Sequence, residues 1–311
     1  MKRGITLAVL MFLVAVAATS PTIVTASATS DGPIVITGLF MPESVIHDEK
    51  ADLYLVSNFG GLTPGNGFIS RVRPDGGFEN KYWITGLLQP KGLAIDGDVL
   101  YVSDVVGVRL FDRRTGAPQG FWPVPFTPNY NWLNDVAVGP NGAIYATDSG
   151  LGLGPGFTLF QTAAMALYQF DCEGNRTVMA EGLPLAGPNG IVVNGANLFV
   201  ATFFDNKIYR VNSSGHVFPV AEVPAFILDG LVRLRDGSLL VSSWSPPAIH
   251  KINPSRREVT TILDETSPWF YWNQSNPLFG QAPADIGFDY MRNRILIPVW
   301  GGNKVIIYPM E

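Results

Sequence analysis

Short apolar runs bounded by turn-forming residues recur along most of the chain. Each copy has a polar residue, a small or apolar stretch, a turn, and an apolar run that usually ends in Ser, Thr, Asp or Asn. Such runs between turn signals are typical of β-strands. Six runs follow the pattern: Leu53–Asn58, Leu100–Asp104, Ile144–Asp148, Leu198–Thr202, Leu239–Ser243 and Ile295–Val299.

The spacing inside each copy is nearly constant. The leading polar residue lies 10 or 11 residues before the Tyr, Phe or Leu of its apolar run. A hairpin explains this regularity, because turn length fixes the register of two paired strands. Turn residues stand at the expected places, as in Asp96-Gly97, Asn194-Gly195 and Asp236-Gly237. Further strand patterns follow within each repeat of 40 to 56 residues, which predicts four strands per repeat and hence a propeller blade.

The last copy lacks its fourth strand. It ends with the strand pattern Lys304–Tyr308, whereas an unassigned strand pattern, Pro33–Thr37, precedes the first copy. If these two segments pair, the ring closes and no open sheet edge remains. The chain is therefore predicted to be an all-β, six-bladed β-propeller over residues 29–311, closed by an N-terminal strand in the last blade. Unrelated antiparallel sandwiches would explain neither the spacing nor the missing strand.

Residues 1–28 have the pattern of a secretory signal peptide. Lys2 and Arg3 precede the apolar run Ile5–Ala18, and Ala26-Ser27-Ala28 is a small-residue cleavage pattern. The alternative is an N-terminal membrane anchor, but a spanning helix needs ~20 apolar residues. We therefore expect a secreted or periplasmic protein that is free of the membrane after cleavage.

Composition and charge narrow the range of partners. Hydrophobic residues make up 47% of the chain, enough for a large core, and the net charge is -5. The sequence has no basic cluster, which argues against nucleic acid and acidic membranes as partners. Cys172 is the only cysteine, so no intrachain disulfide can form.

The leading polar residues of the six copies are candidate site residues. In a propeller the innermost strands line the central channel, so these residues are expected together at its mouth. Most of them carry side-chain oxygens, which calcium and other hard cations prefer as ligands. The alternative is a hydrogen-bonded polar plug in which Lys91 pairs with a carboxylate. The six residues are Glu43, Lys91, Asn134, Asn189, Asp229 and Asp285.

Four short motifs carry a resemblance to a known family. Pro42–Val45, Leu133–Val136, Pro188–Ile191 and Leu228–Leu231 resemble the senescence marker protein, gluconolactonase and luciferin-regenerating enzyme family, whose six-bladed propellers are NHL-repeat-like. The resemblance implies one catalytic divalent metal, commonly calcium, and lactonase activity. It also implies the following roles: Glu43, Asn189 and Asp229 as metal ligands, Asn134 as a further ligand or substrate contact, and Asp229 as general base or nucleophile.

The chain departs from that family at two positions that contact sugar substrates. Trp132 stands where gluconolactonase-like members have an arginine, and Ser149–Gly154 replaces an expected acidic contact. If the aromatic residues near the strand ends face the pocket, the substrate is apolar or aromatic; otherwise they pack between blades. These residues are Trp132, Phe59, Phe203, Trp244 and Trp300. Lys91 has no counterpart among the matched motifs and is interpreted as an ion-pair partner or as a stabiliser of a developing oxyanion.

The leading functional hypothesis is a secreted, metal-dependent hydrolase of a lactone or similar ester, with Asp229 as the catalytic residue and a small molecule as substrate. The alternatives are a non-catalytic binding propeller and a specialised biosynthetic enzyme on the same scaffold. Two further expectations concern single segments. The aromatic stretch Ser267–Trp272 is expected to fold over the channel mouth as a lid or, alternatively, to brace two blades, and His250 is expected to be exposed.

Overall fold

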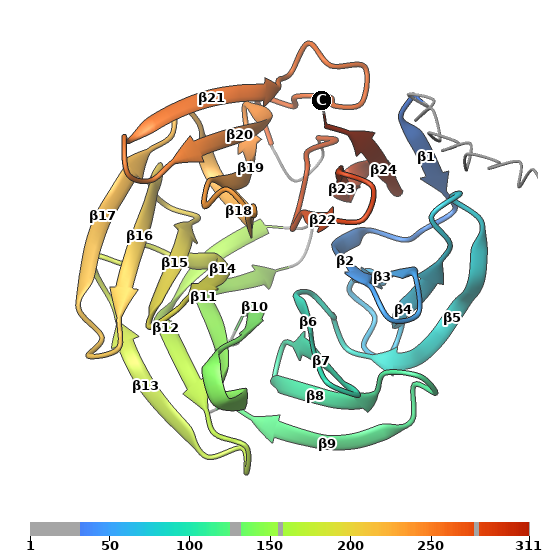
Figure 1. Cartoon of the computed structure of the whole chain (residues 1–311), viewed down its shortest axis with the longest axis horizontal. Helices are drawn as coiled ribbons and strands as arrows, with labels where there is room; N and C mark the ends of the chain where they lie inside the picture. The colour runs from blue at the N-terminus through green and yellow to red at the C-terminus, as the bar shows by residue number, and fades with distance from the viewer. Residues whose placement is uncertain (1–31, 125–131, 155–157, 277–279, 311) are drawn as a thin grey trace, which may run out of the picture. The chain divides into compact units, whose positions relative to one another are not determined.

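Every repeat of the sequence forms one four-stranded antiparallel sheet, and the six sheets are arranged as the blades of a propeller (Figure 1). This computed structural model describes residues 32–124, 132–154, 158–276 and 280–310, with the backbone alone for 153–154 and 158–164. The predicted signal peptide, residues 1–28, lies outside the described residues. The fold is that of the compact unit Asp31–Glu311. The predicted all-β, six-bladed fold is confirmed.

The strands follow the repeats in order. Blade one contains β2 (Pro42–Asp48), β3 (Leu53–Asn58), β4 (Gly67–Val72) and β5 (Phe78–Leu87); blade two contains β6 (Leu93–Asp96), β7 (Val99–Asp104), β8 (Gly107–Asp112) and β9 (Pro118–Pro123). Blade three contains β10 (Leu133–Val138), β11 (Ile144–Gly154), β12 (Thr158–Phe170) and β13 (Arg176–Glu181). Blade four contains β14 (Pro188–Asn194), β15 (Asn197–Thr202), β16 (Lys207–Asn212) and β17 (Val217–Glu222).

The remaining strands form blades five and six. Blade five contains β18 (Phe226–Arg233), β19 (Leu239–Ser245), β20 (Pro247–Asn253) and β21 (Glu258–Leu263). Blade six contains β22 (Gly287–Asp289), β23 (Arg294–Val299), β24 (Lys304–Pro309) and β1 (Ile34–Thr37). Two short 3-10 helices, Pro140–Gly142 and Trp300–Gly302, complete the described structure. No helix in the described part of the chain is long and apolar enough to cross a membrane.

The N-terminal strand closes the ring as predicted. β1 pairs with β24 in antiparallel register, with Ile34 opposite Ile307 and Thr37 opposite Lys304. In Figure 1 the blue β1 lies beside the dark red β24 although the two strands come from opposite ends of the sequence. Ile36 is buried against blade one, so the closure also contributes to the apolar core.

The core consists of apolar layers between neighbouring blades. Side chains alternate along each strand, so both faces of a blade pack on the blades beside it. Trp269 and Phe270 belong to one such layer, between blades five and six. The lid prediction is therefore wrong for these two residues, which act as an inter-blade brace. His250 also departs from expectation, because it lies on β20 with 2% of its surface exposed.

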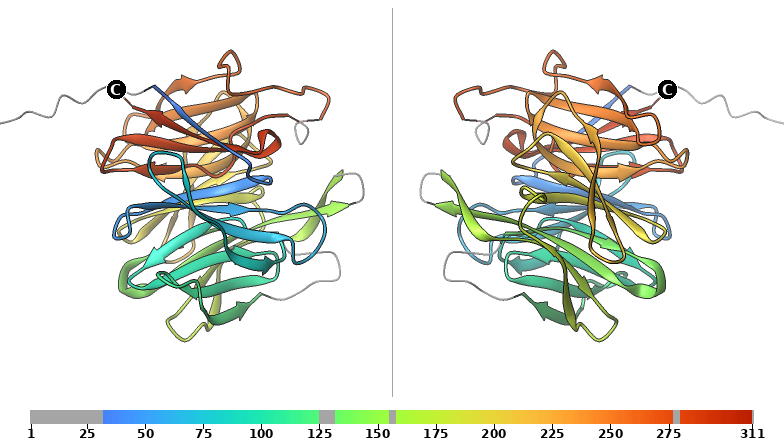
Figure 2. Two further views of the ribbon diagram at one scale, coloured as in Figure 1. Left: turned by 90° about the vertical axis from the view of Figure 1, so that its right-hand side faces the viewer. Right: turned by 90° about the vertical axis from the view of Figure 1, so that its left-hand side faces the viewer.

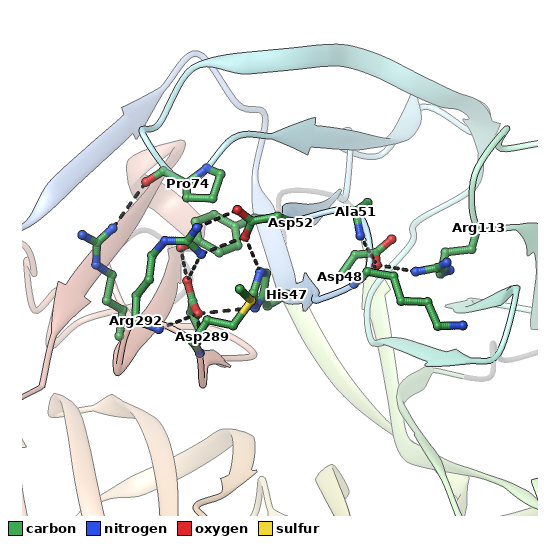
Figure 3. Close-up of polar contacts among 12 residues, drawn as sticks. His47, Asp48, Ala51, Asp52, Pro74, Arg113, Asp289 and Arg292 are labelled. Carbon is green, nitrogen blue, oxygen red and sulfur yellow. Dashed lines mark hydrogen bonds and ion pairs between the residues drawn. The ribbon is translucent and has the colours of Figure 1, made fainter. Parts of the chain in front are cut away.

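A polar network joins blade one to both of its neighbours at one end of the channel (Figure 3). Arg292 of blade six forms an ion pair with Asp52 at 2.6 Å and another with Asp289 at 3.1 Å. His47 lies between the same two carboxylates. On the other side, Arg113 of blade two pairs with Asp48. These contacts hold the turns of three blades together where the ring closes.

The inner strands carry a shared irregularity that positions the site. In β2, Pro42 pairs with Asn58 and Val45 with Val56, so residues 43 and 44 lie opposite a single residue. The same shift occurs in β10, β14 and β18, and the pairings of blade six show it before β22. Such a bulge redirects side chains locally. We call the end of the channel at which the inner strands begin the upper end. The long β11–β12 hairpin projects beyond the ring on this side (Figure 2).

Candidate functional site

The first residue of each bulge lies at the upper end of the channel, and these residues form what we call the upper ring. Glu43, Asn134, Asn189 and Asp229 are each at most 4% exposed, and Lys91 is 1% exposed. Glu43 lies close enough to Asp229 and Lys91 for their charges to interact with its carboxyl group. Asn189 lies beside Asp229 and donates from Nδ2 to the carbonyl oxygen of Leu228 at 3.2 Å. The structure thus brings the predicted residues of blades one, two, four and five together.

In blade six, the residue at the upper-ring position lies one residue earlier in the chain than the sequence analysis predicted. Ala284, not Asp285, occupies the position equivalent to Glu43, because its N–H donates to Pro298 as that of Lys91 donates to Ser103. Asp285 pairs with Ser44 in a parallel bridge and therefore lies one level lower. Matching the repeats by residue type made Asp285 equivalent to Asp229 and so placed it in the upper ring, which is wrong.

The second residues of the bulges form a lower ring, which consists of Ser44, Gly92, Asp135, Gly190, Gly230 and Asp285. The inner strands approach one another so closely here that a Cβ on Gly92 would lie 2.6 Å from Cα of Asp135. A Cβ on Gly230 would lie 2.5 Å from Cα of Asp285. Glycine is required at both positions. Asp135 is a site residue that the sequence analysis missed, although the Asn134-Asp135 pair of polar residues was a visible signal.

Three oxygens of the upper ring are buried without a hydrogen-bond partner among the described residues. They are Oε2 of Glu43, Oδ1 of Asn189 and Oδ1 of Asp229, from three different blades. Leaving a buried carboxylate oxygen unpaired is costly, so such atoms indicate a missing partner. Asn134 donates from Nδ2 to the Ser149 hydroxyl at 3.1 Å, an arrangement that leaves its amide oxygen for the channel. A hard cation with oxygen ligands fits this donor set.

No group of three or more Asp, Glu, His or Cys side chains is arranged to hold a metal among the described residues. The predicted ligand set has two carboxylates and two amides, and it depends on the amide oxygens of Asn134 and Asn189. Its role as a metal site stays a prediction.

Burial dominates the electrostatics of the upper ring. It raises the pKa of Asp229 to about 8, with a further increase from the nearby charge of Asp285. The pKa of Glu43 is raised well above its usual value by burial first and by Asp229 second. Trp244 opposes the shift at Asp229, because its Nε1 donates to Oδ2 at 2.8 Å. Without a cation, this site therefore disfavours two ionised carboxylates.

Lys91 has partners other than those expected. Its ammonium group donates to the carbonyl oxygen of Leu133 at 3.0 Å and lies 4.5 Å from the ring centroid of Trp132. Phe59 provides a second ring face at 5.8 Å. No ion pair within 4 Å joins Lys91 to a carboxylate among the described residues, so the predicted direct ion pair is wrong. Burial lowers the pKa of Lys91 to about 8, and the charge of Glu43 opposes this shift.

The five aromatic residues selected from the sequence gather into one group, which we call the aromatic cluster. Trp132, Phe59, Trp244 and Trp300 are at most 9% exposed, and Phe203 packs against them. Phe59 lies 4.6 Å from Trp300 and 5.9 Å from Trp132, measured between ring centroids. The cluster contacts the upper ring directly through Trp244 and Lys91. The burial of its aromatic residues fits the alternative expectation, that these residues pack between blades.

A set of hydroxyl groups, unrecognised in the sequence, holds the bulges in place. Thr147 accepts a hydrogen bond from the N–H of Asp135 at 3.0 Å and donates to the carbonyl oxygen of Asn189 in the next blade at 2.7 Å. Ser242 does the same between Gly230 and Ala284. The sequence signal was the Ser or Thr that closes most apolar runs.

The chain was compared with known proteins. No protein-family model and no curated protein sequence matches it. Among solved structures, a gluconolactonase from Xanthomonas campestris matches with a TM-score of 0.68 at 18% identity, covering 89% of each chain. A proposed gluconolactonase matches with a TM-score of 0.66 at 16% identity, covering 90% of this chain and 94% of that chain.

Propellers with a different described activity also match. A virginiamycin B lyase from Staphylococcus aureus has a TM-score of 0.58 at 15% identity, covering 90% of this chain and 100% of that chain. At these identities the likeness concerns the fold. The resemblance stated from the motifs is confirmed at that level: the chain has the fold of the gluconolactonase-type six-bladed β-propellers.

Proposed function

We propose that the protein is a secreted hydrolase of lactones or similar esters that depends on a divalent cation. Calcium is the first cation to test. The observation that carries the proposal is the set of three buried, unpartnered oxygens on Glu43, Asn189 and Asp229. These residues, with the amide oxygen of Asn134, would hold the ion. When bound there, a divalent cation supplies a Lewis acid that polarises a carbonyl group.

Asp229 is the candidate general base or nucleophile. Its two oxygens have different surroundings, because Oδ2 accepts a hydrogen bond from Trp244 while Oδ1 has no partner. The indole therefore fixes the orientation of the carboxyl group and leaves one oxygen directed at the channel. A general base must lie within hydrogen-bond reach of the proton that it accepts. A water bound in the upper ring would satisfy this requirement.

Lys91 is suited to stabilise negative charge on the substrate. An ammonium group has three N–H donors. Two of them donate to the carbonyl oxygens of Leu133 and Gln89, so the third is available to an oxygen of the substrate.

The two described gluconolactonases among the structural matches support a lactone as the substrate class. Because Trp132 stands where gluconolactonase-like members have an arginine, a lactone with an apolar or aromatic substituent is favoured over a sugar lactone.

Calcium binding and hydrolysis of a lactone panel test this proposal. The Asp229→Asn variant should keep the melting temperature within a few degrees, lose calcium binding in calorimetry and lose hydrolysis. Asp264→Asn, at a partly exposed loop position after β21, is the matched control and should change neither. Purified protein that binds no divalent cation, or an Asp229→Asn variant with full activity, would contradict the proposal. Calcium binding without turnover of any ester would instead favour a non-catalytic binding propeller.

The proposed extracellular location has its own test. The mature N-terminus of protein recovered from outside the cytoplasm should follow Ala28. Retention of residues 1–28 in membrane fractions would favour an N-terminal anchor.

A further inference from the structure

A cavity of about 610 Å³ occupies the lower half of the channel, on the opposite side of the lower ring from the aromatic cluster. Its lining includes the end of β2 and the turn after it, His47–Lys50, and Gly97 at the lower end. The metal-ligand candidates Glu43, Asn134, Asn189 and Asp229 do not line it. The cavity is therefore separate from the proposed catalytic site.

The walls of this cavity combine aliphatic side chains with charged groups at its lower end. Every inner strand contributes at least one aliphatic side chain, and one from each blade is Ile46, Leu93, Val136, Ile191, Leu231 and Ile286. Such walls favour a hydrocarbon body over a strongly hydrated ligand, because burying apolar surface is the main favourable term in binding.

The inner end of the cavity carries two carboxyl groups. Asp135 and Asp285, which are 6% and 7% exposed, both line the cavity from the lower ring. Three other positions of that ring are Gly92, Gly190 and Gly230, where the inner strands approach one another too closely for a side chain.

No cation in the described part of the chain neutralises these two carboxyl groups. Among the described residues, no Lys, Arg or His nitrogen lies within 4 Å of either. Asp135 accepts hydrogen bonds from the N–H groups of Val136 and Ile191, at 2.7 and 2.8 Å, and Asp285 has the Ser44 hydroxyl beside it. Four basic residues line the cavity at its lower end, where Arg113 is paired with Asp48: His47, Lys50, Arg113 and Arg233. A positive group that reached the inner end would find two uncompensated acidic partners.

The chemistry of the lining distinguishes an organic cation from a metal ion. Calcium takes 6–8 oxygen ligands. The lower ring offers two carboxyl groups and one hydroxyl, and both oxygens of Asp135 already accept a backbone hydrogen bond. An ammonium group needs three acceptors, and its hydrocarbon substituent matches the aliphatic walls.

We propose that the lower half of the channel is a second ligand site, which binds an apolar primary amine with its ammonium group at Asp135 and Asp285. The site is independent of the hydrolase proposal, because it lies beyond the metal-ligand candidates and needs no turnover.

Calorimetric titration of the purified protein with matched probes tests the proposal. Hexylammonium should bind at least about tenfold more tightly than hexanol, which lacks the positive charge. It should also bind at least about tenfold more tightly than methylammonium, which lacks the long hydrocarbon chain. The Asp285→Asn variant should weaken hexylammonium binding by about tenfold or more, since a hydrogen bond to a charged group is removed. The control variant Asp264→Asn should bind like the unchanged protein.

A second variant keeps every charge in place. Val193 lines the cavity and is partly exposed, so Val193→Phe adds volume inside the cavity. It should abolish hexylammonium binding while calcium binding at the upper ring is retained. Equal affinities for hexylammonium and hexanol, or binding that Val193→Phe leaves unchanged, would overturn the proposal. Equal affinities for hexylammonium and methylammonium, both displaced by calcium, would overturn it in favour of a small-cation site.

Discussion

At the scale of single residues, the bulge in each inner strand decides what faces the channel. Two consecutive residues lie opposite one partner, so residues such as Asn134 and Asp135 can contribute to successive rings. A bulge also disrupts the regular ladder and leaves backbone groups that need partners. The hydroxyl groups of Thr147 and Ser242 provide those partners across blade boundaries.

Replacing Thr147 with Val tests this role at nearly constant shape. The change leaves the N–H of Asp135 and the carbonyl oxygen of Asn189 buried without this partner. We expect the free energy of unfolding to fall by about 2 kcal/mol, measured by urea denaturation. Thr177→Val, at an exposed position of β13, is the control and should change stability by less than about 0.5 kcal/mol. Equal effects of the two substitutions would refute the structural role of the hydroxyl.

A second prediction at this scale concerns Trp244. The Trp244→Phe variant keeps an aromatic ring but loses the hydrogen bond from Nε1 to Asp229. Partners that orient a metal ligand typically affect metal affinity by about 10–100-fold, so calcium should bind more weakly by that factor in calorimetry.

Trp300→Phe is the matched control for this experiment. It also removes an indole N–H, but Nε1 of Trp300 has no hydrogen-bond partner in the described structure. Its effect on calcium affinity should therefore be small. If both variants weaken calcium binding equally, aromatic packing rather than the Trp244 hydrogen bond supports the site.

At the scale of elements, β1 is the strand whose loss matters most to ring closure. It covers the edge of β24, and its two faces have different surroundings. Ile36 is 2% exposed, whereas its neighbour Val35 is 38% exposed. The strand therefore offers a buried position and an exposed control within the same element.

We expect Ile36→Ala to lower the free energy of unfolding by about 3 kcal/mol, because it removes buried side-chain volume from the layer between blades six and one. Val35→Ala should cost less than about 1 kcal/mol. Deletion of residues 2–37 should expose the edge of β24 and cause self-association, detectable by size-exclusion chromatography, whereas deletion of residues 2–31 should not. Unchanged stability and a monomeric state after the longer deletion would show that closure does not depend on β1.

At the scale of the whole molecule, buried ionisable groups couple the stability of the fold to pH. His250 lies on β20 with Nδ1 3.1 Å from the Thr261 hydroxyl, and burial lowers its pKa from 6.5 to about 4. The unfolded chain therefore binds a proton at His250 between these two pH values, while the folded protein does not. The stability linked to this group is complete above pH 6.5 and is lost as the pH falls towards 4.

The His250→Gln variant isolates this contribution. Between pH 7 and pH 5, the decrease in unfolding free energy should be smaller in the variant by about 2 kcal/mol, measured by denaturation at both pH values. His216→Gln, at an exposed position, should retain the slope of the unchanged protein. Parallel pH profiles for all three proteins would show that His250 does not contribute to the dependence.

The sequence by itself determined the strands, the number of blades and the closure by β1. These features depend on local apolar patterns, on turn residues and on hairpin spacing, all of which are written along the chain. It also selected Glu43, Asn189 and Asp229, the residues whose oxygens prove to be buried without partners. A polar residue that repeatedly precedes an apolar strand can be recognised from the sequence without knowledge of the tertiary structure.

The tertiary structure alone decided the level at which each residue meets the axis and which groups become its neighbours. Asp285 lies one level below Asp229, because the register of the bulge in blade six follows from pairing with β23 rather than from residue type. Lys91 lies against Trp132 and Phe59 instead of a carboxylate, since neighbours from three blades share the same space. The cavity below Asp135 and Asp285 exists only when six inner strands surround one axis, so no local pattern in the sequence could have predicted it.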